Sequence, residues 1–244
     1  MLERRGSLVL AVICACTACP PLRQPPDSLL AAFTLNHTVP LEFYYVDDSN
    51  KGKGTHYKYS QSDINQLIRE AERFIQQALS VLFGSTHPWY ECLLLALGAS
   101  HVTTVEYNKL TYSHPLITTT TPSLLETTSL FHTALSISSF DHDGLGRYGD
   151  PINPDGDLVA MDTVRNVLEE NGLFFLTVPI GPDVLVWNLH RRYGYQRLPL
   201  LLCGWEEVES VGWEEELLTS PAPFTIQYEP VLILRHLAGC PFLP

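Results

Sequence analysis

Apolar residues recur along this chain with two different spacings, and the two spacings predict a succession of helices and strands. Over residues 62–78 they fall three and four positions apart, which predicts a helix with one buried face. A short apolar run over 80–83 follows and stops at Gly84. Residues 89–97 are apolar nearly all round, which is typical of a helix buried against a sheet. This part of the chain therefore predicts a helix, a short strand, a glycine turn and a second helix.

The alternation continues toward the C-terminus. Runs of β-branched and apolar residues predict strands over 101–107, 115–121, 133–140 and 173–179. Helices are predicted over 123–130 and from an N-cap at Asp157 to Asn171-Gly172. Two later apolar runs, 198–205 and 224–236, have little helix between them, which favours an antiparallel pair at the edge of the sheet. Strands that alternate with helices indicate an α/β fold with a doubly wound, mostly parallel sheet.

The N-terminus has a different pattern. Arg4 and Arg5 precede a short apolar run rich in small side chains, and a proline pair follows that run. This order fits a signal peptide or signal-anchor over residues 1–20, because the run is too short for a comfortable membrane span. A buried N-terminal element of a cytoplasmic protein is the alternative.

Residues 21–60 are expected to form a linker and an N-terminal arm, with an edge strand over 41–46. The main domain is expected over 61–244. The expected localisation is the secretory pathway or the outside of the cell, with the cytoplasm as the alternative. Contact with a membrane is expected only through the N-terminal signal-anchor.

Composition narrows the class of function. Apolar residues make up 45% of the chain and charged residues 17%, which is enough for a sizeable core. The formal net charge of −12 repels phosphate backbones and therefore disfavours a nucleic-acid partner. Cys92, Cys203 and Cys240 lie outside the N-terminal segment, and their scattered spacing predicts neither a disulfide framework nor a structural metal site.

The turn after the 80–83 strand has the chemistry of a cofactor site. Gly84 lets the backbone approach a ligand closely, and Pro88 suits the first turn of a helix whose free N–H groups can hold a carboxylate or hydroxyl. Glu106 closes the next predicted strand, where a carboxylate commonly accepts the hydroxyls of a ribose. The alternative is a tight strand–helix turn followed by an exposed glutamate.

This order of elements resembles the class I S-adenosylmethionine-dependent methyltransferases. Three blocks, "GSTHPWYECLLLALGASHVTTVEYN", "SISSFDHDGLGRYGDPINPDGD" and "GLFFLTVPIGPDVLVWNLHRRYG", are similar to an uncharacterised methyltransferase-like family first catalogued from nematodes as a domain of unknown function. The resemblance covers residues 60–236 and implies a Rossmann-like, seven-stranded sheet with an antiparallel C-terminal edge strand. It also implies S-adenosylmethionine as the cofactor, bound by Gly84, Ser85, Pro88, Glu106, Tyr107, Asn108 and Ser139.

Polar residues are concentrated over 138–151, after the strand where class I methyltransferases place substrate-facing residues. Asp141, His142 and Asp143 supply a candidate catalytic base and carboxylates that could orient it. Methyl transfer chiefly needs alignment of the reacting groups, and it needs a base only if the acceptor must lose a proton.

Four further residues are candidates for contact with the substrate. Arg147 and Tyr148 lie in the same polar stretch, where Arg147 could hold an anionic substrate or simply pair with Asp150. Asn188 and His190 follow the 173–179 strand and would line the rim of the same cleft. The alternative for this last segment is an ordinary surface helix.

The leading functional interpretation is a methyltransferase-like enzyme that acts on a small molecule, a sugar or a protein side chain. A small-molecule or carbohydrate substrate is therefore the expected partner. The glycine-rich consensus of active methyltransferases is reduced here to a single glycine, which favours the alternative of a catalytically inactive Rossmann-like scaffold. A nucleotide-sugar-modifying protein of the secretory pathway is a third interpretation, compatible with the N-terminal segment.

Overall fold

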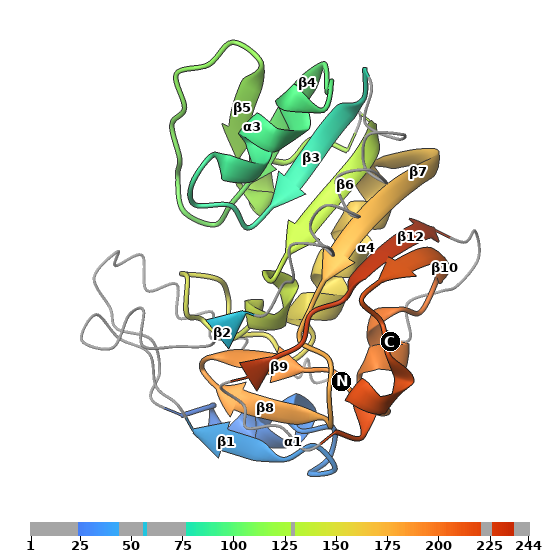
Figure 1. Cartoon of the computed structure of the whole chain (residues 1–244). Helices are drawn as coiled ribbons and strands as arrows, with labels where there is room; N and C mark the ends of the chain where they lie inside the picture. Colours follow the sequence, from blue (N-terminus) through green and yellow to red (C-terminus); the bar gives the residue numbers. More distant parts are fainter. Residues whose placement is uncertain (1–23, 44–55, 58–76, 128–129, 221–225, 237–244) are drawn as a thin grey trace, which may run out of the picture.

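The computed structural model describes residues 24–43, 56–57, 77–127, 130–220 and 226–236. The predicted N-terminal segment over 1–20 and nearly all of the predicted helix over 62–78 lie outside these residues. The main sheet contains β3 (Leu79–Phe83), β4 (His101–Val105), β5 (Ile117–Thr120), β6 (Phe131–Ile137), β7 (Leu168–Thr177), β10 (Trp205–Val211) and β12 (Val231–His236). Their order across the sheet is β10-β12-β7-β6-β3-β4-β5 (Figure 1).

Strand direction confirms the predicted fold class. Strands β5, β4, β3, β6 and β7 pair in parallel. Strand β12 runs antiparallel to both of its neighbours, β7 and β10, and therefore lies inside the sheet. The sheet is seven-stranded and mostly parallel, with an antiparallel C-terminal strand next to the edge strand β10.

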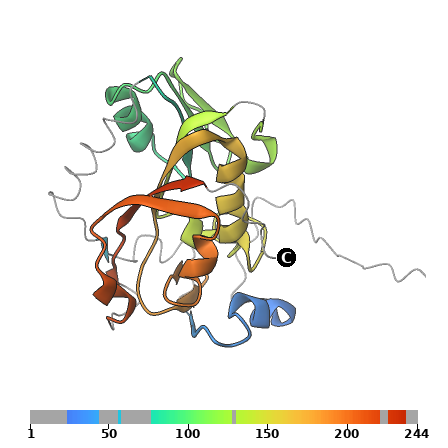
Figure 2. The same ribbon diagram turned by 90° about the vertical axis from the view of Figure 1, so that its right-hand side faces the viewer.

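Helices cover both faces of this sheet. The helical segments are η1 (Asp27–Leu29), α1 (Leu30–Phe33), α3 (Trp89–Ala96), η2 (Pro122–Leu124), η3 (Phe140–His142), α4 (Gly156–Val167), α5 (Leu198–Leu201) and η4 (Glu215–Leu218). Helix α3 packs on one face, with Leu94 against Leu82 and Val102, and α4 packs on the other, with Val164 near Phe174 (Figure 2). A parallel sheet buried on both faces explains why its strands read as nearly continuous apolar runs.

A smaller sheet lies at the end of the molecule toward which the parallel strands point (Figure 1). It contains β1 (Leu41–Phe43), β8 (Val184–Trp187) and β9 (His190–Arg192), in the order β1-β8-β9. The rings of Phe33 and Trp187 meet edge to face with centroids 5.2 Å apart, which holds α1 against β8. The predicted edge strand over 41–46 is confirmed for residues 41–43, and its remainder lies outside the described residues. A separate two-stranded pair joins β2 (His56–Tyr57) to β11 (Ile226–Gln227).

Several predicted boundaries differ from the structure. Helix α4 ends at Val167, and Asn171-Gly172 lies inside β7, where Asn171 has a positive φ of 66°. The N-cap of α4 is Asp155, whereas the Asp157 carboxylate is buried and binds Arg197. The helix predicted over 123–130 is reduced to η2.

The antiparallel pair predicted near the C-terminus is present, but its first strand is shifted. The apolar run 198–205 forms α5, and the pairing strand is the acidic segment β10 instead. Within the described residues, no helix is long and apolar enough to cross a membrane.

Candidate functional site

A cavity of about 210 Å³ lies at the edge of the sheet where β3, β4 and β6 end. Its wall includes Phe83, Val105 and Ser138, which stand at these strand ends, and one face of α4. Parallel strands end at the same edge, so the turns that follow them converge on a single site. Of the predicted site residues, the cavity is lined by Gly84, Glu106, Tyr107, Ser139, His142, Asp143 and Tyr148.

Gly84 is required by its conformation and by its neighbour. Its φ is +75°, a region that side chains rarely adopt, and its N–H donates to the Val105 carbonyl at 3.0 Å. A Cβ at this position would lie 1.8 Å from Ser139 Oγ. The turn after β3 and the turn after β6 are therefore in direct contact at Gly84 and Ser139, both on the cavity wall.

Ser85 faces away from the cavity. Its Oγ lies 2.9 Å from the His87 carbonyl and 3.2 Å from Glu91 Oε2. Glu91 is fully buried on α3 and also accepts a hydrogen bond from Thr104 Oγ1 at 2.8 Å, so this carboxylate ties α3 to the turn and to β4. Pro88 precedes α3 as its N-cap and does not line the cavity. Sequence reasoning missed Glu91, although an acid in an otherwise apolar helix was a visible signal.

Glu106 is buried at the end of β4, with 6% of its surface exposed, so the alternative of an exposed strand-end glutamate is wrong. Its Oε1 accepts hydrogen bonds from the Asn108 backbone N–H at 3.2 Å and from Asn108 Nδ2 at 3.3 Å. Asn108 does not line the cavity, and its Nδ2 also donates to the Tyr148 carbonyl at 3.0 Å. Asn108 therefore joins the strand-end carboxylate to the polar loop across the cavity.

Tyr107 and Asp143 form a hydrogen-bonded pair on the cavity wall. Burial raises the pKa of the Tyr107 hydroxyl, and the charges of Asp143 and Asp150 raise it further, so this hydroxyl remains a donor. Burial also raises the pKa of Asp143 well above its usual range, and Asp150 adds to this shift. The pair places a carboxyl group, biased toward its neutral form, against the cavity.

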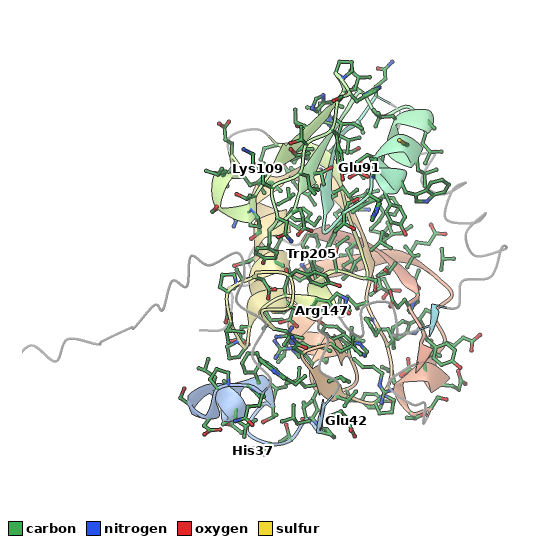
Figure 3. The ribbon with its side chains drawn as sticks, turned by 90° about the vertical axis from the view of Figure 1, so that its left-hand side faces the viewer. His37, Glu42, Glu91, Lys109, Arg147 and Trp205 are labelled. Atoms are coloured by element: carbon green, nitrogen blue, oxygen red, sulfur yellow. The ribbon has the colours of Figure 1, made fainter. Side chains whose placement is uncertain are left out.

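The ion pair between Arg147 and Asp150, which the sequence left open as one alternative, does not form. Asp150 instead accepts backbone N–H groups of Gly146 at 2.8 Å and Tyr148 at 3.0 Å, which closes the turn of the polar loop. The Arg147 guanidinium lies over the Tyr148 ring, 4.9 Å from its centroid, and donates from Nη1 to the Leu189 carbonyl at 3.2 Å. Figure 3 shows Arg147 in the middle of the molecule, between Glu91 at one end and Glu42 at the other.

His142 has a defined tautomer. Its Nδ1 donates to the Leu189 carbonyl, which can only accept, so Nε2 carries the lone pair. Nε2 lies 3.5 Å from Asp141 Oδ2. Burial lowers the pKa of His142 well below its usual range, and Arg147 lowers it further, so the imidazole is neutral at physiological pH. The ring also meets the Tyr148 ring edge to face, with centroids 5.4 Å apart.

Asp141 lies behind His142 and does not line the cavity. It is fully buried, and neither carboxylate oxygen has a hydrogen bond within the described part of the chain. Burial raises the pKa of Asp141 well above its usual range, and the charge of Glu229 adds to this. Glu229 accepts hydrogen bonds from Ser138 Oγ at 3.1 Å and Thr177 Oγ1 at 3.3 Å, and the sequence offered no sign of this role.

Asn188 and His190 belong to the β8–β9 hairpin, so the alternative of a surface helix is wrong. Both side chains are fully buried and neither lines the cavity. The His190 ring lies 6.4 Å from the His142 ring, and neither of its nitrogens has a hydrogen bond among the described residues. Arg191, on the same hairpin, donates from Nη1 to the Asp143 carbonyl at 2.6 Å. The hairpin therefore supports the polar loop from behind.

In the part of the chain that the structure describes, no group of three or more His, Cys, Asp or Glu side chains is arranged to hold a metal ion. Cys92 is a free thiol.

Residues 77–224 match the family model described as Caenorhabditis protein of unknown function, DUF268. The chain belongs to the DUF268 family. The match includes every residue that lines the cavity, so the site lies within the DUF268 region. A search of curated proteins found no match to this DUF268 chain.

Solved structures show the fold of the DUF268 chain. It is similar to the 1,6-didemethyltoxoflavin-N1-methyltransferase of Burkholderia thailandensis, with 17% identity over 89% of this chain and 94% of that chain, and a TM-score of 0.53. It is also similar to the N-methyltransferase NodS of Bradyrhizobium japonicum WM9, with 13% identity over 73% of this chain and 98% of that chain, and a TM-score of 0.49. The first likeness, together with the strand order, shows that the DUF268 chain has the class I methyltransferase fold.

Proposed function

We propose that this protein is an S-adenosylmethionine-dependent methyltransferase whose cofactor binds in the cavity at the ends of β3, β4 and β6. The observation that carries the proposal is that Gly84 and Glu106 line one cavity, in the fold of a methyltransferase. Had these residues lain far apart, or had side chains filled the space between them, the cofactor would have had no place.

The residues present fit an adenosyl group. Glu106 offers a carboxylate at the strand end, where ribose hydroxyls can donate to it, and Tyr107 and Pro122 provide flat surfaces nearby. Thr86 and Ser139 add hydroxyls on the side of the glycine turn. When bound, the cofactor supplies an electrophilic methyl group. Ser85, Pro88 and Asn108 act in this proposal from behind the wall, by fixing the turn and the Glu106 side chain.

His142 is the candidate base. Its Nδ1 is committed to the Leu189 carbonyl, so the neutral ring can receive a proton only at Nε2. Asp141, beside that nitrogen, and Asp143, on the cavity wall, are positioned to orient it and the acceptor. The acceptor is a small molecule or carbohydrate in this proposal, because the cavity is small, at about 210 Å³, and the chain carries a net charge of −12.

The catalytically inactive scaffold is the second candidate, and two contacts favour it. Ser139 Oγ covers the α-carbon of Gly84, where an active enzyme would let a ligand approach. Glu106 Oε1 already accepts two hydrogen bonds from Asn108. Both contacts would have to coexist with the cofactor or rearrange when it binds.

Calorimetric titration with S-adenosylmethionine and S-adenosylhomocysteine tests the proposal. We expect both to bind and to raise the melting temperature. Glu106→Gln keeps one oxygen for Asn108 but removes the charge, so we expect affinity to fall roughly 10- to 100-fold, the loss of hydrogen bonds to a charged group. Glu169→Gln removes the same charge at a half-exposed site on β7 and should bind as the native protein does.

Absence of both heat and thermal stabilisation would rule out the enzyme and leave the scaffold. Binding that is unchanged in Glu106→Gln would remove the ribose assignment alone.

The N-terminal part of the proposal concerns residues 1–20. We propose that they direct the protein into the secretory pathway, as the basic and apolar segments favour. Intact-mass analysis of the protein from a eukaryotic secretory host tests this, because cleavage removes the segment and a retained segment leaves the full mass.

A further inference from the structure

The cavity wall contains acidic side chains but no lysine or arginine among the described residues. The acidic side chains are those of Glu106 and Asp143. The polar groups that complete the wall are hydroxyls and the His142 imidazole, whose Nε2 is an acceptor. A ligand in this cavity therefore meets mainly hydrogen-bond acceptors near Asp143 and His142.

Among the described residues, the two arginines that contact residues of this wall are already engaged in other interactions. Arg147 covers the Tyr148 ring and donates to the Leu189 carbonyl. Arg191 donates to the backbone carbonyls of Asp143 at 2.6 Å and Pro154 at 3.0 Å. A phosphate, sulfate or carboxylate on the acceptor would thus be buried beside carboxyl groups, without a lysine or arginine among the described wall residues to pair with, which is strongly unfavourable. The grip of Arg147 on an anionic substrate, expected from the sequence, has no support in this arrangement.

We infer, on the basis of the proposed function, that the methyl acceptor is an amine that enters as its ammonium form and is recognised by Asp143, Tyr148 and His142. An ammonium has several N–H donors, and this wall presents several acceptors. The Tyr107 hydroxyl can satisfy only one oxygen of Asp143 at a time, which leaves the other for the ligand. Tyr148, 38% exposed at the cavity, offers an aromatic ring to the cation.

An alcohol would use this wall less fully. A hydroxyl has one proton to donate, so it would leave an acceptor on Asp143 or His142 unpaired. It would also bring no positive charge that could stabilise Asp143 in its carboxylate form. The groups that act on Asp143 are Asp150, Arg191, Asp157 and Asp141, and burial with Asp150 biases its carboxyl toward the neutral form. Binding of a cation favours the ionised form of Asp143, so the Asp143 carboxyl releases its proton when the cation binds.

The chemical step balances with these residues. The bound ammonium loses one proton to solvent by way of His142 Nε2, which holds the proton only transiently because its pKa is lowered, and this loss frees the nitrogen lone pair. That lone pair forms the N–C bond to the methyl carbon while the C–S bond breaks, and the bonding electrons remain on sulfur in S-adenosylhomocysteine. The methylated ammonium carries the positive charge away.

Calorimetry with three probes of similar shape tests the inference: phenethylamine, 2-phenylethanol and phenylacetate. Each is titrated with and without saturating S-adenosylhomocysteine, so that the outcome does not depend on cofactor binding. We expect the amine to bind at least about 10-fold more tightly than the other two, as one charged contact allows. Repeating the titration in buffers of different ionisation enthalpy should show proton release with the amine alone.

Variants assign the preference to residues. Asp143→Asn should lose the amine preference and the proton release, and Glu169→Gln should keep both. Tyr148→Leu removes no fully buried polar group and should weaken the amine roughly 2- to 5-fold, as loss of a cation–π contact does. It keeps the inference testable if Asp143→Asn fails to fold.

Two results would overturn the inference. One is the absence of an amine preference, including failure of all three probes to bind. The other is an Asp143→Asn variant that keeps its amine affinity but binds S-adenosylmethionine less well relative to S-adenosylhomocysteine, which would assign Asp143 to the sulfonium. Failure of both cofactor forms to bind concerns the proposed function and is read from a separate titration.

Discussion

Asp141 and Asp157 are both fully buried, yet their surroundings are opposite. Asp157 Oδ2 accepts hydrogen bonds from Arg197 Nε at 2.9 Å and the Tyr193 hydroxyl at 3.0 Å, and Oδ1 accepts from Arg197 Nη2 at 2.5 Å. Asp141 has no hydrogen bond to either oxygen within the described residues, and its Oδ2 lies 3.5 Å from His142 Nε2.

The pKa values of the two carboxyl groups move in opposite directions. Burial by itself would raise the pKa of Asp157, but Arg191 and Arg197 outweigh it and lower that pKa. Burial raises the pKa of Asp141, and Glu229 raises it further. A buried carboxylate that is hydrogen-bonded and ion-paired stabilises the fold. A buried carboxylate without such partners has a shifted pKa, and shifted pKa values are common at sites where a proton is transferred. By this criterion Asp157, at the start of α4, anchors the fold, whereas Asp141 belongs to a candidate site beside the cavity.

Removal of the anchor should have the largest effect. Asp157→Asn leaves Arg197 buried without its charge partner, and we expect the free energy of unfolding to fall by about 3–5 kcal/mol. Urea denaturation measures this. Asp155→Asn is the matched control, because Asp155 is half-exposed and lies 3.5 Å from the same arginine, so it should cost less than about 1 kcal/mol. Equal losses in the free energy of unfolding of the two variants would contradict the proposal that Asp157 anchors the fold.

The pH dependence of stability should distinguish the two aspartates by sign. The pKa of Asp157 is lowered on folding, so its contribution is complete above the unfolded value of about 4 and is lost as the pH falls through the folded value. The pKa of Asp141 is raised, so the folded state is favoured at low pH and this advantage is lost as the pH rises above about 4 toward the folded value.

Unfolding curves of the native protein, Asp157→Asn and Asp141→Asn across this range provide the measurement. The difference in the free energy of unfolding between the native protein and Asp157→Asn should become smaller below about pH 4. The stability of Asp141→Asn relative to the native protein should increase as the pH rises. If the stability of both variants relative to the native protein changed with pH in the same direction, the proposed contrast between Asp157 and Asp141 would be wrong.

The smallest effect is expected at neutral pH for Asp141→Asn. An amide of the same shape removes a poorly paired carboxyl group, so stability should change by less than about 1 kcal/mol and could increase. The proposed role of Asp141 beside His142 would appear instead in turnover, with cofactor affinity retained. A loss of several kcal/mol would show that Asp141 is a second anchor with partners formed in solution.

The sequence predicted the parts of this molecule that depend on local pattern. Strands β3 and β4 and helix α3 were predicted from their apolar runs. The position of Gly84 and Glu106 on one cavity could be predicted because parallel strands end at the same edge of a sheet. The edge strand β10 was missed because Glu206, Glu207 and Glu209 interrupt its apolar positions, and charged side chains are usual on edge strands.

Roles set by distant partners could not be predicted. Asp157 resembled a helix cap in the sequence, and only the fold brings Arg197, which lies 40 positions away, onto its carboxylate. The same holds for Glu229, whose hydrogen-bond partner Ser138 is separated from it by 91 positions. Pattern rules act over a few residues, whereas a buried polar group is assigned its role by whichever segment packs against it.

Strand β12 is late in the chain but inside the sheet, and this order constrains how the protein is made. Until residues 231–236 emerge from the ribosome, β7 and β10 cannot be joined and each presents an unpaired edge. Exposed edges invite pairing with other chains. A nascent chain halted before Val231 would therefore be prone to aggregate through the open edge of β7, which β12 covers once it has been translated.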